Sequence, residues 1–374
     1  MLVVIPAERR SGEQRVAAVP DTVRALCGAG FEVVVEAGAG LAAQVDDESY
    51  RVAGATISDS DPVAGAELVL SVRALEPERT GRLALGATTI SLLSPTTELD
   101  VVRALRDQKI TAFSLDLLPR ISRAQSMDAR SSQALVAGYR AVLIAADRLP
   151  RFFPLFMTAA GTVPPARVLV LGAGVAGLQA IATARRLGAR VEAYDVRAAA
   201  GDEVRSLGAI FLELGLETQE GDGGYAREQS DEFLRRQREL IGARVAAADV
   251  VITTAAIPGR TAPILVTADM VDRMAPGSVV VDLAAESGGN CELSVAGQET
   301  RRGTVVVYGA QNIESQLAAD ASRLYARNVT NLLTAIGHEG AVEPDFTDEI
   351  VDGCCVTHDG EVRHEPTRVL LGAS

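Results

Sequence analysis

The sequence predicts an α/β protein of two domains built on parallel sheets, and three observations lead to this prediction. The chain has 374 residues, which is long for one domain. Short apolar runs typical of strands alternate with amphipathic helical segments along most of the chain. Such alternation produces parallel strands with helices on both faces of a sheet. Hydrophobic residues make up 48% of the chain, which is enough to fill the cores of both domains.

The first 120 residues contain five expected strands and no glycine-rich nucleotide motif. Helices are expected between these strands at Asp21–Cys27 and Thr97–Asp107, each of which begins shortly after a proline. The expected strands are Leu2–Ile5, Glu32–Val35, Leu68–Val72, Thr89–Leu93 and Ile110–Leu115.

A polar, irregular stretch, Leu118–Ser132, follows the fifth strand and leads into a long helix expected over Ser131–Leu149. Either Asp128 or Ser131 can serve as the N-cap of this helix, because their side-chain oxygens accept the free N–H groups of a helix start. A pair of prolines, Pro164 and Pro165, then precedes the second domain.

The second domain is organised around the segment RVLVLGAGVAGLQAIATARRLGARVEAYD, residues 167–195. An apolar strand enters a turn whose three glycines have G-x-G-x-x-G spacing. In such a turn the glycines allow a tight bend, close approach of the backbone to a pyrophosphate, and close helix–strand packing. The helix N-terminus that follows offers N–H groups and its dipole to the phosphates. The predicted cofactor-binding residues of the turn are Gly172, Gly174, Val175, Ala176 and Gly177.

The residues after this turn complete a βαβ unit. A helix is expected over Val175–Leu187 with Gly188 at its C′ position, followed by a strand at Arg190–Tyr194. Asp195 ends that strand, and its carboxylate is expected to accept the hydroxyls of an adenosine ribose. Because a carboxylate at this place repels a 2′-phosphate, we predict NAD(H) rather than NADP(H) as the cofactor. The predicted site at this strand end comprises Asp195, Val196 and Arg197.

The remainder of the chain is expected to continue the alternation of strands and helices, with short elements and polar loop after Gly337. A long polar loop at 215–230 contains Tyr225 and is expected to be a functional segment, because loops of this length inside βα units are uncommon. The expected helices are Gly201–Leu207, Asp231–Ala247 and Glu314–Ile336, and the expected strands are Ile210–Leu214, Val250–Thr253, Val279–Leu283 and Val305–Tyr308.

The composition argues against several function classes. A net charge of −13 disfavours nucleic acid and anionic membrane surfaces as direct partners. No apolar run reaches the roughly 18 residues of a membrane-spanning helix, so no direct membrane insertion is expected. The first residues, MLVVIPAERR, lack the layout of a signal peptide, which predicts a cytoplasmic location. The four cysteines fit neither a zinc spacing nor a disulfide framework, so no metal is expected.

Four passages carry a resemblance to a known family: IPAERRSGEQRVAAVP at 5–20, PRISRAQSMDARSSQALVAGYRAV at 119–142, MTAAGTVPPARVLVLGAGVAGLQAIATARRLGA at 157–189 and PGSVVVDLAAESGGNCELS at 276–294. Over nearly its whole length the chain resembles the NAD(H)-binding component, domain I, of proton-translocating NAD(P) transhydrogenases. It looks like the split form, in which this component, the first part of the alpha subunit, is a separate soluble polypeptide. The first passage is shared with alanine dehydrogenases, whereas RISRAQSMD is specific to transhydrogenases.

The resemblance implies two Rossmann-like, doubly wound parallel-sheet domains separated by a nucleotide cleft. The first domain would comprise residues 1–130 and 316–374, and the NAD-binding domain residues 131–315, with the long helices near 131–149 and 314–336 connecting them. A homodimer is also implied, which would associate with membrane subunits and with a separate NADP(H)-binding component. The chain would then lie in the cytoplasm, peripheral to the membrane, and NADP(H) would bind only to the partner component.

The resemblance also implies a set of catalytic residues, Arg120, Gln125, Asp128 and Ser131. Hydride passes directly between two nicotinamide rings in such enzymes, so the protein must hold the rings in a near-attack arrangement and needs no general acid or base. The Arg and Ser side chains can donate to the carboxamide oxygen of the nicotinamide, and the Asp can accept from its nitrogen. The Gln is implied to face the ribose of NADP(H). The alternative is that Asp128 merely caps a helix and the arginines are solvated.

Three further cofactor-binding residues are implied, and two departures from the family pattern stand out. Gly224 and Tyr225 belong to a GDGGYA stretch that resembles a mobile loop closing over NAD(H), and Ala256 completes the set. Family members usually have a G-x-T-N-x-P-S-R-like stretch where this chain has GAQNIESQ at 309–316, and Ser71 stands where a lysine is common.

Two other functions compete with this interpretation. An amino-acid dehydrogenase resembling alanine dehydrogenase would use a lysine and a histidine in the first domain. Here the only lysine is Lys109, and no histidine precedes His338. A non-catalytic NAD-binding subunit is the second alternative, although such a subunit has no need of the polar set that would orient a nicotinamide.

Overall fold

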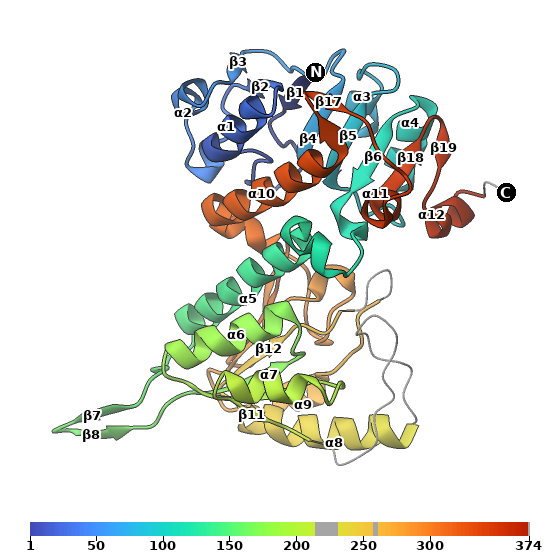
Figure 1. Ribbon diagram of the computed structural model, residues 1–374. Helices are drawn as coiled ribbons and strands as arrows, with labels where there is room; N and C mark the ends of the chain where they lie inside the picture. Colours follow the sequence, from blue (N-terminus) through green and yellow to red (C-terminus); the bar gives the residue numbers. More distant parts are fainter. Residues whose placement is uncertain (214–230, 257–260, 373–374) are drawn as a thin grey trace. The chain divides into compact units, whose positions relative to one another are not determined.

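The computed structural model describes residues 1–213, 231–256 and 261–372, and the chain divides into two compact units. The first unit comprises Met1–Gln133 and Glu314–Ser374, and the second comprises Ala134–Ile313. Each unit contains one large sheet with its own helices (Figure 1). The prediction of two α/β sheet domains is therefore confirmed, although each sheet is mixed rather than wholly parallel.

The sheet of the first unit has eight strands in the order β19-β18-β6-β5-β4-β1-β2-β3. Strands β1 to β6 are parallel to their neighbours, whereas β18 lies antiparallel to β6 and to β19. The strands are β1 (Leu2–Ile5), β2 (Glu32–Glu36), β3 (Thr56–Ser58), β4 (Leu68–Arg73), β5 (Thr88–Leu92), β6 (Thr111–Ser114), β18 (Cys355–His358) and β19 (Glu361–Val362).

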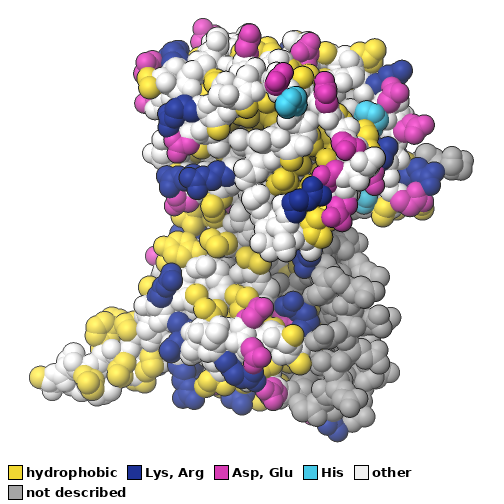
Figure 2. Space-filling model, viewed as in Figure 1, with side chains coloured by type: hydrophobic (Ala, Val, Ile, Leu, Met, Phe, Trp, Pro, Cys, Tyr) yellow, Lys and Arg dark blue, Asp and Glu magenta, His cyan; other side chains and the backbone are white. Residues whose placement is uncertain are grey.

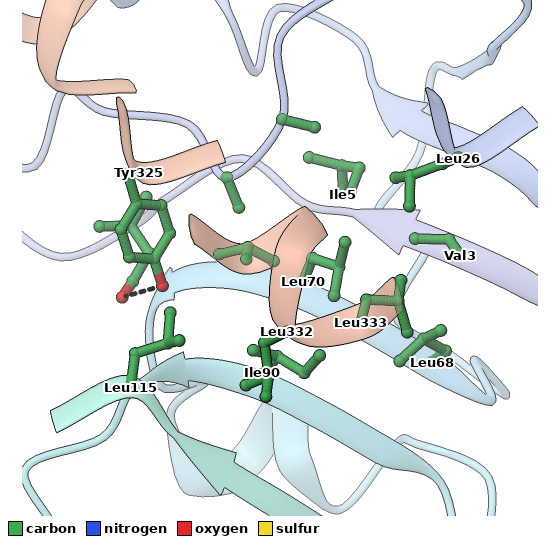
Figure 3. Close-up of a cluster of buried hydrophobic side chains, with 14 of the residues drawn as sticks. Val3, Ile5, Leu26, Leu68, Leu70, Ile90, Leu115, Tyr325, Leu332 and Leu333 are labelled. Atoms are coloured by element: carbon green, nitrogen blue, oxygen red, sulfur yellow. Dashed lines mark hydrogen bonds between the residues drawn. The ribbon is translucent and has the colours of Figure 1, made fainter. Parts of the chain in front are cut away.

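Alternate residues of the strands in this unit fill two cores, one on each face of the sheet. Leu68 and Leu70 of β4 face a core that also contains residues of α1 and α10, while Val69 faces the core under α4. Figure 3 shows Leu68, Leu70 and Ile90 packed against Leu332 and Leu333 of α10. This period of two along buried strands is the pattern of a sheet covered on both sides.

The helices of the first unit lie between these strands and after the chain returns to this unit. They are α1 (Pro20–Gly28), α2 (Asp47–Val52), α3 (Pro77–Thr80), α4 (Leu99–Asp107), α10 (Ala318–Ile336), α11 (Glu349–Cys354) and α12 (Glu365–Leu370). Helix α5 (Ala129–Arg148) begins in the first unit and continues into the second. Among the described residues, no helix is both long enough and apolar enough to cross a membrane.

The sheet of the second unit has seven strands in the order β11-β10-β9-β12-β13-β15-β14. All pairs are parallel except β14 with β15. The chain order reverses between β9 and β12, and ligands of doubly wound sheets bind beyond the carboxyl ends of the strands at this kind of switch point. The strands are β9 (Arg167–Leu171), β10 (Arg190–Tyr194), β11 (Ile210–Phe211), β12 (Val250–Thr253), β13 (Val279–Asp282), β14 (Glu299–Arg302) and β15 (Val305–Gly309).

Helices cover both faces of this second sheet as well. Val168 and Val170 of β9 face the core that α5, α6 (Val175–Arg186) and α7 (Ala200–Ser206) complete. On the other face, Leu169 and Leu171 meet residues of α8 (Asp231–Ala247) and α9 (Ala268–Asp272).

Several short elements differ from the expectation. The tail after residue 337 contributes β18 to the first sheet, and residues 156–163 form a hairpin of β7 (Phe156–Thr158) and β8 (Gly161–Val163). The expected helix Glu314–Ile336 begins at Ala318, because Ile313–Leu317 forms a 3₁₀ turn. The two strands of the hairpin have three residues each, which is too few to show a period of two, so the sequence gives no clear signal for them.

Candidate functional site

The glycine turn at the end of β9 has the geometry of an anion site. Helix α6 begins at Val175 with Gly174 as its N-cap, and its first hydrogen bond joins the Leu178 N–H to the Gly174 carbonyl (2.8 Å). The N–H groups of the first turn precede this bond and have no acceptor within the helix. Together with the dipole of a twelve-residue helix they favour a negatively charged ligand.

The three glycines of the turn serve different purposes. A Cβ atom at Gly177 would lie 1.9 Å from the Gly172 carbonyl oxygen, so that glycine lets α6 pack on the turn. Gly172 has φ +104°, and a Cβ there would lie 2.5 Å from the Thr254 hydroxyl. A Cβ at Gly174 would meet no described protein atom within 4 Å. The protein itself therefore requires Gly172 and Gly177, whereas the space beside Gly174 holds no described atom of the protein and can receive a ligand.

A fourth glycine, which the sequence interpretation overlooked, supports the same turn. A Cβ at Gly138 of α5 would lie 2.1 Å from the carbonyl oxygen of Ala176, so α5 passes close to the first turn of α6. The only sequence signal is the glycine in the middle of an otherwise helical, apolar segment, a position that often has a packing reason.

The carboxylate of Asp195 is fully engaged within the second unit. Its Oδ2 accepts the N–H of Ala173 (2.7 Å) and an Nη2 hydrogen of Arg197 (3.0 Å). Its Oδ1 accepts the backbone N–H and the Nε–H of Arg197 (2.8 and 3.0 Å). The side chain is only 8% exposed. All four lone-pair positions are thus in use, so ribose hydroxyls can reach this carboxylate only in competition with Arg197.

The segment after β12 lies directly against the glycine turn. The Thr254 N–H donates to the Leu171 carbonyl (2.8 Å), and the Thr254 hydroxyl donates to the Gly172 carbonyl (3.1 Å). Ala256, predicted to bind the cofactor, lies two residues further on and is exposed. Val196, another predicted residue, lies half-buried between Asp195 and Arg197.

The polar set of the first unit lies on a 3₁₀ turn, Ser122–Met127, and on the residues that flank it, from Arg120 to the start of α5. Helix α5 begins at Ala129, and Asp128 is its N-cap: Oδ1 accepts the N–H of Ser131 (2.9 Å) and Oδ2 accepts the Ser131 hydroxyl (2.5 Å). Of the two candidate caps, Asp128 is therefore the one observed. The structure brings Asp128 and Ser131 into direct contact, both half-buried, while Arg120 and Gln125 are exposed.

Two asparagines of α10 hold this turn in place. The amide nitrogens of Asn328 and Asn331 both donate to the Ser126 carbonyl (2.9 Å each). The Ser132 hydroxyl donates to the Asn328 amide oxygen (2.7 Å). The chain therefore positions Asp128 through a helix that lies about 200 residues further along the sequence.

The remaining predicted residues, Gly224 and Tyr225, lie outside the described residues. Within the described part of the chain, no group of three or more His, Cys, Asp or Glu side chains could hold a metal ion. Burial raises the pKa of the Cys291 thiol to about 11, and the pKa of Cys355 to about 12, so both remain protonated near neutral pH.

Comparisons with known proteins agree with this geometry. Residues 4–137 match the N-terminal domain of the alanine dehydrogenase/PNT family, and residues 141–365 match its C-terminal domain. The chain is 48% identical to the first part of NAD(P) transhydrogenase subunit alpha of Rhodospirillum rubrum, covering 97% of this chain and 98% of that protein. It is 44% identical to NAD(P) transhydrogenase subunit alpha of Haemophilus influenzae, covering 96% of this chain and 71% of that protein. A crystal structure of transhydrogenase from Sinorhizobium meliloti superposes with a TM-score of 0.85 at 43% identity, covering 97% and 98% of the two chains.

Proposed function

Since this chain belongs to the alanine dehydrogenase/PNT family, we propose that it is the NAD(H)-binding component of a proton-translocating NAD(P) transhydrogenase. Hydride would pass between NAD(H) held by this chain and NADP(H) held by a partner component. The observation that carries the proposal is the glycine turn, where the space beside Gly174 and the first N–H groups of α6 suit a pyrophosphate. Proton translocation would reside in membrane subunits.

Direct hydride transfer needs no proton donor or acceptor. The histidines of this chain, the residues that most often fill such roles, lie far in the sequence from the residues proposed to bind the nucleotide. His358 pairs with the Thr111 hydroxyl (3.0 Å), and His364 pairs with the Thr367 hydroxyl (2.7 Å). His338 is exposed at the end of α10. All three belong to the C-terminal portion of the first unit, away from both the glycine turn and the RISRAQSMD turn in the sequence.

We further propose that Arg120, Gln125, Asp128 and Ser131 orient the reacting groups. The Asp128 carboxylate could accept from the carboxamide nitrogen of a nicotinamide, and its bond to the Ser131 hydroxyl would hold it in place. A fixed carboxylate of this kind favours one ring orientation, which matters because transfer depends on placing both reacting carbons in a near-attack arrangement.

An amino-acid dehydrogenase is the second candidate, and the residue at the lysine position disfavours it. Ser71 is buried in β4, where its carbonyl accepts the Tyr325 hydroxyl (2.8 Å). The single lysine, Lys109, is exposed in the turn after α4. Neither residue offers a buried cation for a substrate carboxylate.

Mixing the purified chain with the NADP(H)-binding domain of a related transhydrogenase tests the proposal directly. We expect NADPH to reduce an NAD analogue only when both proteins are present. L-alanine alone is expected to give no NADH. Steady NADH formation from L-alanine would support the dehydrogenase instead, and NADH binding with no transfer to the partner domain would support a non-catalytic subunit.

Nucleotide preference should depend on Asp195 and Arg197 together. We expect the parent to bind NADH at least about tenfold more tightly than NADPH, or about 1.4 kcal/mol, because a 2′-phosphate would meet the carboxylate. Asp195→Ala releases the Arg197 guanidinium, which can then pair with the phosphate, so this preference should vanish. Fluorescence titration with both nucleotides measures the effect. In the double variant Asp195→Ala/Arg197→Ala, the gain in NADPH affinity should disappear; if it persists, Arg197 plays no part.

A homodimer is also proposed, supported by the β7–β8 hairpin of the second unit. Among the described strands, these two pair only with each other, and an isolated hairpin is marginally stable in water. The hairpin exposes Phe156, Met157 and Val163, which are 41%, 76% and 38% exposed, and hydrophobic side chains line this arm in Figure 2. A second copy of the chain would cover this apolar surface, as exposed patches of this kind mark protein interfaces.

Sedimentation velocity tests this assembly. We expect the parent to sediment as a dimer and Met157→Asp to sediment as a monomer, because a charge at the apolar surface would oppose its burial. Leu85→Asp in the first unit is the matched control, since Leu85 is similarly exposed (70%) and should leave the dimer intact. A Met157→Asp protein that remains dimeric would show that the hairpin is not the interface.

A further inference from the structure

We propose that Asn290, braced by Asp282, is a positioning residue for dinucleotide binding, which fixes the backbone after β12 against the glycine turn. This inference rests on the proposed function, because it concerns the support of that same site. Both side chains act on the turn indirectly, through the backbone of Ala255.

The Asn290 side chain is completely buried, and its amide group forms hydrogen bonds with both the N–H and the carbonyl of Ala255. Its amide oxygen accepts the N–H of Ala255 (2.9 Å), and its amide nitrogen donates to the carbonyl of Ala255 (2.8 Å). The second hydrogen on that nitrogen goes to the Pro263 carbonyl (2.8 Å). One side chain thus satisfies three backbone groups of Ala255 and Pro263, two residues that belong to neither strand nor helix.

Asp282, at the end of β13, fixes the position of Asn290. Its Oδ2 accepts the N–H groups of Asn290 and Cys291 (2.8 and 3.0 Å) and the Ser294 hydroxyl (2.7 Å). Its Oδ1 accepts the Thr253 hydroxyl (2.9 Å), which lies on the last residue of β12. The carboxylate is fully buried, and these hydrogen bonds stabilise its charge while they join the ends of the two strands.

On the side away from Asn290, residues 254 and 255 contact the glycine turn. Thr254 bonds both Leu171 and Gly172, and a Cβ added at Gly172 would lie 3.2 Å from the Ala255 nitrogen. Ala255 therefore lies between the turn on one side and Asn290 on the other. Without Asn290, three backbone groups of Ala255 and Pro263 would lose their hydrogen-bond partners, and the segment would be free to move away from the turn.

Asn290→Ala should therefore weaken NADH binding on the order of 10- to 100-fold, the size of effect known for residues that orient the ligands of a metal site, because Asn290 holds the backbone of Ala255 in a comparable way. Asn290→Ser keeps a hydroxyl that can replace only part of the network, so a smaller loss is expected. This second variant also serves if Asn290→Ala does not fold. Calorimetric titration at 25 °C, well below each melting temperature, measures the affinities.

Asp249→Asn is the matched control. Asp249 is equally buried in the same unit, where it directly precedes β12 at the amino ends of the strands, and it accepts the Arg167 N–H (2.8 Å) and pairs with Arg151. Both substitutions should lower the melting temperature, but Asp249→Asn should bind NADH within about twofold of the parent, which is well under 1 kcal/mol.

Two results would overturn the inference. Parental NADH affinity in Asn290→Ala or Asn290→Ser would mean that the segment keeps its position without the amide. An equal loss of affinity in Asp249→Asn would mean that Asn290 acts only through general stability. Failure of the parent to bind NADH is a separate result, which would contradict the proposed function itself.

Discussion

Asp128→Asn should slow hydride transfer to NADP(H) on the partner domain by a factor on the order of 10 to 10³, while NADH affinity stays nearly unchanged. Asparagine is as good an N-cap as aspartate, so α5 should keep its start and the Ser131 N–H its acceptor. The substitution removes the carboxylate that would accept from the nicotinamide carboxamide. Arg120→Ala is expected to have a similar effect. Single-turnover transfer, measured beside NADH titration, separates the two quantities.

A second N-cap aspartate in the same unit provides the control for Asp128→Asn. Asp46 caps α2 by accepting the Ser49 N–H (2.7 Å), and it lies at the surface, remote in sequence from the RISRAQSMD turn. Asp46→Asn should transfer hydride at the parental rate. If Asp128→Asn does the same, Asp128 is only a helix cap and the proposed orienting role is wrong.

Gly174→Val should abolish NADH binding, with an affinity loss of more than about 100-fold, or about 2.7 kcal/mol. The Cβ atom at this position would meet no atom of the described residues within 4 Å and would point into the space that a pyrophosphate would occupy, so the valine should block the ligand without disturbing the ligand-free protein. Gly174 has φ −76° and ψ −169°, a conformation that valine adopts readily. Losing a glycine N-cap costs about 1 kcal/mol or less, so the melting temperature should fall by only a few degrees.

Gly177→Ala provides the opposite case in the same turn. Its Cβ would lie 1.9 Å from the Gly172 carbonyl oxygen, so α6 must shift, and we expect a loss of about 1–3 kcal/mol or more in the free energy of unfolding. Chemical denaturation measures the free energy of unfolding of both variants, and NADH titration measures their affinities. Gly174→Val should lose affinity with little loss of stability, whereas Gly177→Ala should lose stability. A Gly174→Val protein that still binds NADH would place the pyrophosphate elsewhere.

The sequence alone predicted the elements whose signals are local. Strand β10 occupies Arg190–Tyr194 as expected, α6 begins at the predicted Val175, and β12 matches the predicted Val250–Thr253. These segments are apolar or amphipathic over several residues, and α6 lies between Gly174 and Gly188, so their type can be read from a short window. The same window identified the glycine turn, since its spacing lies within six residues.

The tertiary structure decided the features that depend on partners far along the chain. Strand β18 joins the first sheet beside β6, although some 240 residues separate them, and Asn328 of α10 supports the turn that carries Asp128. The close backbone approach at Gly138 and the hydrogen bonds from the Asn290 side chain to Ala255 and Pro263 likewise become visible only in the tertiary structure. No sequence spacing encodes such an approach.

Asp195 shows both contributions at one residue. Its place at the end of the second strand of a βαβ unit follows from the sequence, and so does its candidacy for the adenosine ribose. Only the fold shows that Ala173 and Arg197 already donate hydrogen bonds to the carboxylate. The periodic pattern of apolar residues determined which segments became strands and helices, whereas the need to satisfy each buried polar group decided which distant residues support the site.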